Sequence, residues 1–98
     1  MHPNKVGYMR TQLHVLSIDR EHGIVFLEDL GGPFMSITNN AQSVLRYVQS
    51  HYGSKFRTVY RDTENEWWEI KPQHDLGWKY ADVEFEPWDG LAWDLLKK

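Results

Sequence analysis

The sequence has no cysteine among its 98 residues. Disulfide bridges, thiolate metal sites and a cysteine nucleophile are therefore excluded. Disulfides do not persist in the reducing cytoplasm, so the absence of cysteine favours a cytoplasmic protein. No apolar run approaches the roughly 20 residues of a membrane span, and the first residues lack the apolar core of a signal peptide. We therefore expect no association with membranes.

Motifs for catalysis and for cofactor binding are also missing. No serine stands in a nucleophile-elbow pattern, and no histidine pair has the spacing of metal ligands on one element. Gly31-Gly32-Pro33 lacks the Lys-Ser/Thr pair of a phosphate-binding loop and indicates a turn. His74-Asp75 allows a catalytic pair, but solvated loop residues are the expected interpretation. We expect no cofactor and no metal.

Size and composition indicate one folded domain over residues 1–98, with residues 1–10 loosely ordered and Met9 as an alternative start. Hydrophobic residues make up 41% and charged residues 26%, as in ordinary globular domains. The net charge of −3 is unevenly distributed. Seven Lys/Arg against four Asp/Glu give residues 1–61 a charge of +3, and four Lys against ten Asp/Glu give residues 62–98 a charge of −6. All five tryptophans also lie in the second half, so this half is the one that bears on partners.

Turn chemistry and apolar spacing predict a β-hairpin followed by a helix. Residues 11–18 and 24–29 have the composition of strands, and the spacer between them begins with Asp and ends with Gly. An apolar stripe at helical spacing predicts the main helix over about residues 40–52, with Asn39 and Gln42 as a capping box and Thr38 as the alternative cap. The stripe consists of Ala41, Val44, Leu45, Val48 and Tyr52.

The turn of a second hairpin sets the register of its strands. Apolar and polar residues alternate in residues 56–62 and 66–71, as in strands. The turn that joins these strands is three residues long, residues 63–65, and this length places Tyr60 opposite Trp68. This register sorts apolar side chains to one face and most charged side chains to the other. The expected apolar face carries Phe56, Thr58, Tyr60, Trp68, Ile70 and also Asp62, whereas the opposite face carries Arg57, Val59, Arg61, Trp67, Glu69 and Lys71.

Asp62, Glu69 and Lys71 offer an enzymatic alternative. Metal-dependent nucleases of the restriction type use an Asp followed by Glu-x-Lys on neighbouring strands, where the acids bind Mg²⁺ and the lysine helps to position the attacking water. The three-residue turn, however, places Asp62 and Glu69 on opposite faces of the hairpin. Ordinary cross-strand charge pairs, with Lys71 or Glu69 as the neighbour of Arg57, are therefore the preferred interpretation.

Arg57 and Arg61 suggest a second alternative, a protein that binds single-stranded nucleic acid. The two arginines flank Val59 on one strand face, and aromatic residues such as Tyr60 offer stacking surfaces. The protein is acidic overall, however, and the neighbouring strand carries Glu69. Binding to a nucleic-acid backbone depends on positive charge at the contact, so nucleic acid is not an expected partner.

The last third of the chain is both acidic and rich in aromatic residues. Alternation predicts a half-buried strand over residues 78–86, and Trp88, Leu91, Ala92 and Leu95 recur at the spacing of a short helix. Aromatic and acidic side chains that this pattern leaves exposed form a candidate partner-binding surface, because Trp and Tyr anchor many interfaces. Packing of the tryptophans at the edge of a small core is the alternative. The candidate surface consists of Trp78, Tyr80, Asp82, Glu84, Glu86 and Trp93.

The predicted elements follow the order β-β-α-β-β-β-α. This order indicates an α+β fold, in which an antiparallel sheet carries the main helix on one face and a short helix ends the chain. Because the sequence contains no catalytic motif, we expect a non-enzymatic protein-binding module. Its expected partner is another protein, and a homodimer is a further option.

Two strings within residues 13–71, FLEDLGGPFMSITNNAQSVLRYV and FRTVYRDTENEWWEI, resemble short uncharacterised proteins of phages and prophages. Those proteins carry a similar EDLGGP-SITN-A segment and a YRD…W-EL hairpin. The resemblance implies no catalytic or binding residue, because these proteins have no assigned activity. It implies an accessory protein that acts by binding a protein of the host.

Overall fold

The computed structural model describes residues 13–32, 36–72 and 83–96, which form a five-stranded sheet and three helical elements. The strands are β1 (His14–Asp19), β2 (Ile24–Glu28), β3 (Arg57–Arg61), β4 (Trp67–Pro72) and β5 (Val83–Pro87). The helical elements are the 3₁₀ turn η1 (Thr38–Asn40), α2 (Ala41–His51) and α3 (Trp93–Leu96). The predicted α+β class and the order of the elements are confirmed. Residues 1–10, expected to be loosely ordered, lie outside the described ranges.

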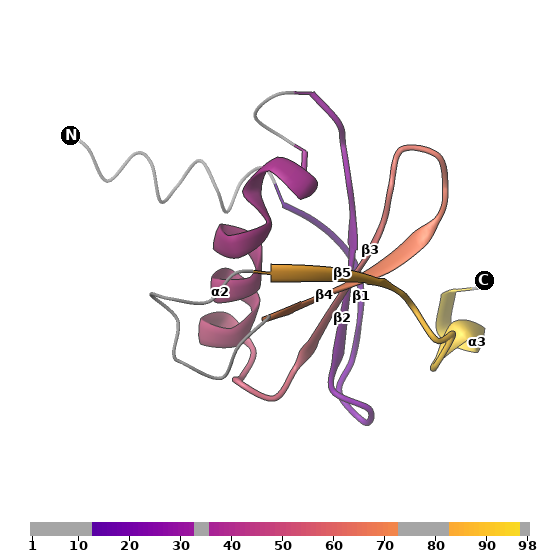
Figure 1. Cartoon of the computed structure of the whole chain (residues 1–98). Helices are drawn as coiled ribbons and strands as arrows, with labels where there is room; N and C mark the ends of the chain where they lie inside the picture. The colour runs from indigo at the N-terminus through magenta and orange to yellow at the C-terminus, as the bar shows by residue number, and fades with distance from the viewer. Residues whose placement is uncertain (1–12, 33–35, 73–82, 97–98) are drawn as a thin grey trace.

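The strands lie in the sheet in the order in which they occur in the chain, β1-β2-β3-β4-β5 (Figure 1). Three of the four ladders are antiparallel, but β2 and β3 run parallel, from Ile24 opposite Arg57 to Glu28 opposite Arg61. The prediction of a purely antiparallel sheet is therefore wrong at its centre. A parallel pair requires a long crossover, which α2 provides. The turn motifs in the sequence predict pairing only between strands that a short turn joins, so they do not predict the pairing of β2 with β3.

The first hairpin is confirmed, and its turn is closed by Asp19. The carboxylate accepts a hydrogen bond from the backbone N–H of His22 at 3.2 Å and contacts Nδ1 of the same residue at 2.6 Å. Gly23 ends the turn with a φ of 68°, a conformation that favours glycine. Burial opposes ionisation of Asp19, but the hydrogen bonds from His22 outweigh it and lower the pKa of this carboxyl.

The main helix is confirmed, but its start differs from the prediction. Asn40 occupies the N-cap position of α2 and makes no side-chain capping hydrogen bond, so the Asn39–Gln42 capping box is wrong. The chain instead enters α2 through η1, where the Ser36 hydroxyl accepts a hydrogen bond from the N–H of Asn39 at 3.4 Å. The buried side of α2 contains four of the five residues of the predicted stripe, Ala41, Val44, Leu45 and Val48. The fifth, Tyr52, lies at the C-cap and is half-buried.

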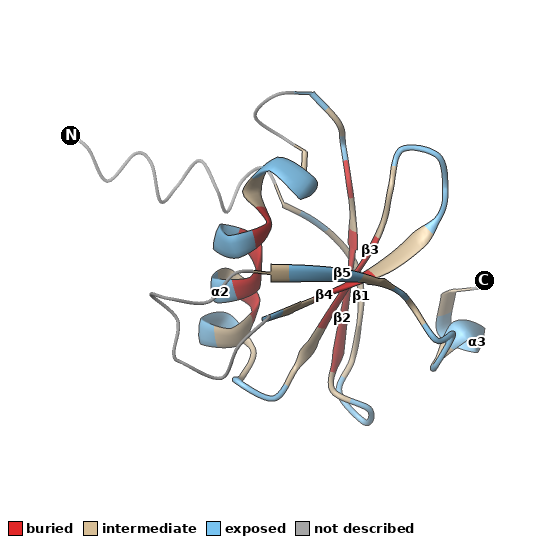
Figure 2. Ribbon diagram, in the orientation of Figure 1, coloured by how far each residue is buried: buried red, intermediate tan, exposed pale blue. Residues whose placement is uncertain are grey.

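Each face of the sheet carries its own core. Buried residues concentrate in the central strands and on the side of α2 that faces the sheet (Figure 2). Between α2 and the sheet, the first core includes Val25, Leu27, Tyr60 and Ile70 together with the α2 stripe. On the opposite face, the second core consists of Ile24, Phe26 and Val59, covered by Leu16, Trp67, Trp88, Ala92 and Leu96. The strands β2 and β3 are thus buried on both faces, as is usual for a parallel pair.

The C-terminal helix is shorter than its apolar spacing suggests. Only Trp93–Leu96 are helical, because Gly90 and Ala92 adopt positive φ values of 86° and 68° and interrupt the helix. The predicted packing stripe is consequently wrong at two positions: Leu91 and Leu95 are 40% and 42% exposed. None of the helices within the described ranges has the length and apolarity needed to cross a bilayer.

Candidate functional site

The β3–β4 hairpin has the register that the sequence predicts. Tyr60 lies opposite Trp68, and the N–H of Asp62 donates to the carbonyl of Glu66 at 2.8 Å. The tip between them is a tight turn, in which the N–H of Asn65 donates to the carbonyl of Asp62 at 3.0 Å. Asn65 has a φ of 68°, which asparagine tolerates better than most residues. The three-residue turn at residues 63–65 is therefore confirmed.

The candidate nuclease residues are not brought together by this hairpin. Asp62 accepts a hydrogen bond from Nε1 of Trp68 at 2.9 Å, on the face that packs against α2. Glu69 binds Arg57 on the opposite face, and Lys71 contacts Glu86 at 3.0 Å. The two carboxylates point to opposite sides of the sheet, so they cannot share one metal ion.

Asp62 instead holds the hairpin tip. Its Oδ1 accepts hydrogen bonds from the N–H groups of Glu64 and Glu66, each at 2.8 Å, while Oδ2 takes the Trp68 indole. The bond from the Glu66 amide outweighs the opposing effect of burial and, with the Trp68 and Glu64 bonds, lowers the pKa of Asp62. The ionised carboxylate is thus a structural part of the turn.

Replacing Asp62 by asparagine is expected to lower the free energy of unfolding by about 2 kcal/mol at pH 7, because asparagine presents an N–H group to one of these three donors. A carboxyl whose folded pKa is lowered stabilises the fold above its ordinary value of 3.8 and loses this effect as the pH falls through the folded pKa. The difference between wild type and Asp62→Asn should therefore shrink below pH 3.8. Urea unfolding as a function of pH measures it, with the exposed Glu64→Gln as the matched control. A constant difference across the acid range would contradict this role.

A polar hollow of about 560 Å³ lies at the carboxyl ends of the parallel strands β2 and β3. Ligands often bind at such positions in sheets with parallel strands. Two of its three carboxylates, however, already serve their own turns, because Asp29 accepts the N–H of Gly31 at 2.8 Å and Asp62 holds the hairpin tip. The third, that of Glu64, is exposed. Burial, with smaller contributions from Asp29 and Asp62, raises the pKa of the neighbouring Tyr60 to about 12. The hollow therefore carries no free acid–base pair among its described residues, and we assign it no function. Its lining also includes Gly32, Ser36, Thr38, Asn39, Thr63 and Glu64.

One group of possible metal ligands occurs in the described part of the chain. Donor atoms of Asp19, Glu21 and His22 lie within 4.8 Å of one another in the β1–β2 turn. No sequence signal points to this group, because the spacing is not that of a known metal site. The close contact between Asp19 and His22 already closes the turn, so the arrangement has a sufficient structural explanation.

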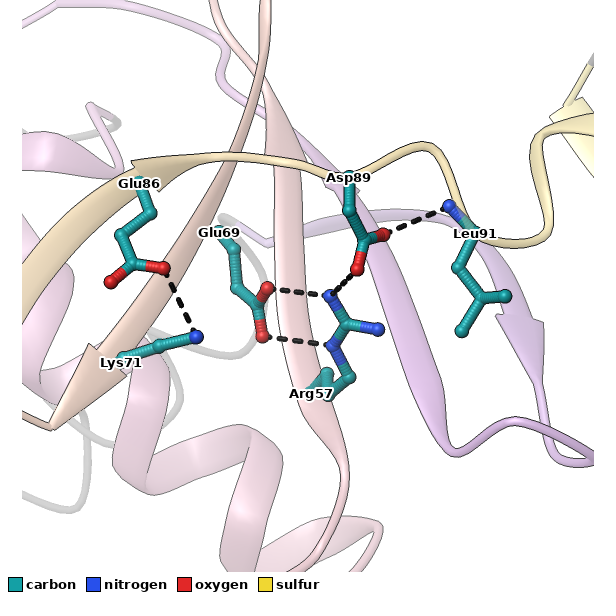
Figure 3. Close-up of polar contacts among 6 residues, drawn as sticks. All are labelled: Arg57, Glu69, Lys71, Glu86, Asp89 and Leu91. Atoms are coloured by element: carbon teal, nitrogen blue, oxygen red, sulfur yellow. Dashed lines mark hydrogen bonds and ion pairs between the residues drawn. The ribbon is translucent and has the colours of Figure 1, made fainter.

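Charged side chains on the face opposite α2 form a paired network (Figure 3). Arg57 binds Glu69 through two hydrogen bonds, Nε to Oε2 at 2.9 Å and Nη2 to Oε1 at 2.7 Å, and also contacts Asp89 at 3.1 Å. Glu69 is the main reason that the pKa of Arg57 is raised. The bond from the N–H of Leu91, together with Arg57, lowers the pKa of Asp89. The predicted cross-strand charge pairing of Arg57 with Glu69 is confirmed.

The same pairing engages the two arginines of the nucleic-acid alternative. Besides the Arg57 network, Arg61 donates to Glu28 at 2.7 Å, and its guanidinium lies 5.7 Å from the ring centroid of Trp67. Binding a phosphate backbone would require both arginines to exchange carboxylates for phosphates. The geometry thus offers this alternative no additional support.

Half of the predicted partner-binding residues fall within the described ranges. Glu84 is exposed, Glu86 is half-exposed and pairs with Lys71, and Trp93 is 41% exposed. The indole of Trp93 nevertheless contacts two tryptophans of the second core, Trp67 and Trp88, with ring centroids 6.2 Å and 5.9 Å apart. Trp78, Tyr80 and Asp82 lie outside the described residues.

The sequence does not predict the exposure of two residues near Trp93, Leu91 and Leu95. Apolar spacing predicts that Leu91 and Leu95 pack, but they are 40% and 42% exposed. Gly90, directly before Leu91, is the available signal, because a glycine inside a predicted helix weakens it and often marks its boundary. With Trp93, these residues place three large exposed hydrophobic side chains within five positions of the chain.

Comparison of the chain with protein-family models, with curated proteins and with solved structures finds no match.

Proposed function

We propose that this protein is a non-enzymatic protein-binding module whose C-terminal segment, residues 83–96, contacts the partner. The observation that carries the proposal is the exposure of Leu91, Trp93 and Leu95. Clustered large hydrophobic side chains at the surface are typical of interaction sites. Trp93 suits the role of an anchor, because tryptophans of the core support one side of its ring.

The charge of the C-terminal segment indicates which chemical groups the partner carries. Residues 83–96 contain four carboxylates and no lysine or arginine. Arg57 and Lys71 engage Asp89 and Glu86, whereas Glu84 and Asp94 have no ion-pair partner among the described residues. An acidic rim around apolar residues favours a partner that combines basic and apolar groups, because opposite potentials speed association and select partners. The predicted surface residues Trp78, Tyr80 and Asp82 remain part of this proposal as predictions.

The nature of the partner is informed by the resemblance of residues 13–71 to phage and prophage proteins. That resemblance stays a prediction. It implies that the partner is a protein of the host and that this chain is an accessory factor. The non-enzymatic part of the proposal is supported by the separation of Asp62 from Glu69 and by the structural use of both carboxylates.

Affinity purification from the native host tests the proposal. The wild-type protein should retain a partner that the double variant Leu91→Ala/Leu95→Ala loses, while circular dichroism shows both to be equally folded. Leu30→Ala is the matched control, because Leu30 is 47% exposed but lies two residues after the end of β2, outside the C-terminal segment. If the double variant retains every protein bound by the wild type, the proposed surface is wrong.

A further inference from the structure

The strand β5 forms one edge of the sheet. It pairs with β4 on one side, and none of the described residues pairs with its other side (Figure 1). The N–H of Trp88 donates to the carbonyl of Trp67, which fixes the direction of the backbone groups along β5. In an antiparallel ladder these directions alternate, so Glu84 and Glu86 bond to β4, whereas Val83 and Phe85 direct their backbone groups outward.

The side chains of β5 also differ between the two faces of the sheet. Phe85 lies on the α2 side, where its ring is 6.3 Å from that of Tyr60, and it is 39% exposed. Glu84 and Glu86 lie on the other side, where Lys71 contacts Glu86 and no cation of the described ranges forms an ion pair with Glu84. The edge therefore presents an apolar face and an acidic face at alternate positions.

A second copy of the chain is a poor occupant of this edge. If two β5 strands paired antiparallel about Phe85, Glu84 of each copy would lie opposite Glu86 of the other. Both of these pairs would be of the non-hydrogen-bonded type, in which the side chains are closer. Like charges in this position are destabilising. Pro87, opposite Val83, would also lack the N–H that the pairing needs. The homodimer option is therefore disfavoured at this edge.

We propose that β5 binds an extended segment of the partner as an added, antiparallel sixth strand, and that this segment alternates basic with apolar residues. Backbone groups of Val83 and Phe85 supply the hydrogen bonds, as in other cases of strand addition. Residues of the segment opposite Phe85 are apolar, and those opposite Glu84 and Glu86 are Lys or Arg. This inference rests on the proposed function and specifies the chemistry of the partner.

A fluorescent peptide of alternating lysine and valine, seven residues long, serves as the probe with the full-length protein. In an antiparallel added strand, the valine N–H groups face β5 and the lysine N–H groups face away. Peptides N-methylated on valine should therefore lose binding in fluorescence anisotropy, whereas peptides N-methylated on lysine should retain it. Hydrogen exchange at the Val83 and Phe85 amides should slow when the unmodified peptide binds.

Two matched protein variants separate strand addition from general charge attraction. Glu84→Lys should weaken peptide binding about tenfold, because an attractive cross-strand pair becomes a repulsive one. Glu21→Lys changes the net charge equally, but Glu21 is exposed in the β1–β2 turn at the opposite edge of the sheet, so this variant should weaken binding less than about twofold. Equal effects of both variants, binding of the valine-methylated peptide, or unprotected β5 amides would each overturn the inference. The outcome of these experiments does not affect the Leu91→Ala/Leu95→Ala experiment. The proposed protein-binding function can therefore be supported or rejected independently of strand addition at β5.

Discussion

Replacing Phe26 by alanine is expected to lower the free energy of unfolding by about 4 kcal/mol, because a large buried ring is lost and a cavity remains. Phe26 is fully buried, and its ring contacts Trp67 and Trp88 with centroid distances of 6.0 Å and 5.2 Å. The cavity would lie between the sheet and the C-terminal segment, which covers this face. Urea unfolding followed by tryptophan fluorescence and by circular dichroism measures the change.

Two further variants keep this expectation testable even if Phe26→Ala fails to fold. Phe26→Leu retains most of the apolar volume and should lose only about 1–2 kcal/mol. Leu30→Ala, at an exposed position after the same strand, should change stability by less than about 0.5 kcal/mol. If Phe26→Leu and Leu30→Ala have equal effects, the second core contributes little to stability and the covering role of the C-terminal segment is wrong.

Arg57→Ala is expected to destabilise the protein by about 3 kcal/mol, because it leaves the carboxylate of Glu69 buried without its partner. Glu69 is only 5% exposed, and both of its oxygens accept hydrogen bonds from Arg57. The change also releases Asp89, which helps to fix the chain at the start of the segment that leads to α3. Thermal and urea unfolding report the loss.

The matched control for Arg57 is Lys71→Ala, which removes a cation from an exposed pair with Glu86 and should cost less than about 1 kcal/mol. The double variant Arg57→Met/Glu69→Leu should recover most of the lost stability, because apolar residues of similar volume replace buried ion pairs at little cost. A double variant as unstable as Arg57→Ala would show that the arginine acts through something other than the buried charge of Glu69.

Local turn chemistry makes both hairpins predictable from the sequence. The turn that ends at Gly23 and the tip at residues 63–65 each leave few alternative registers, and side-chain alternation then assigns the residues of β3 and β4 to a face. In β1 the alternation is interrupted by a register shift between Val15 and Ser17. The separation of Asp62 from Glu69, which bears on the candidate site, follows from the register of β3 and β4 alone. For the same reason the pairing of Arg57 with Glu69 is predictable from sequence.

The features that the sequence does not reveal depend on contacts between distant segments or on single backbone angles. The parallel pairing of β2 with β3 follows from the position of α2 on the sheet, which no turn motif encodes. The exposure of Leu91 and Leu95 follows from a positive φ at Ala92, a residue that rarely adopts this conformation. A helical repeat of apolar residues therefore overstates the length of α3.

The parallel pairing of β2 with β3 also bears on the rate of folding. It pairs Glu28 with Arg61, 33 residues apart, because α2 lies between β2 and β3 in the chain, whereas shorter connections separate the strands of the other ladders. Closing a long loop costs more chain entropy than closing a hairpin, and contacts between distant residues slow folding. We therefore expect the protein to assemble from two locally paired halves, β1–β2 and β3–β4–β5, with the entropic barrier to uniting them concentrated where β2 meets β3.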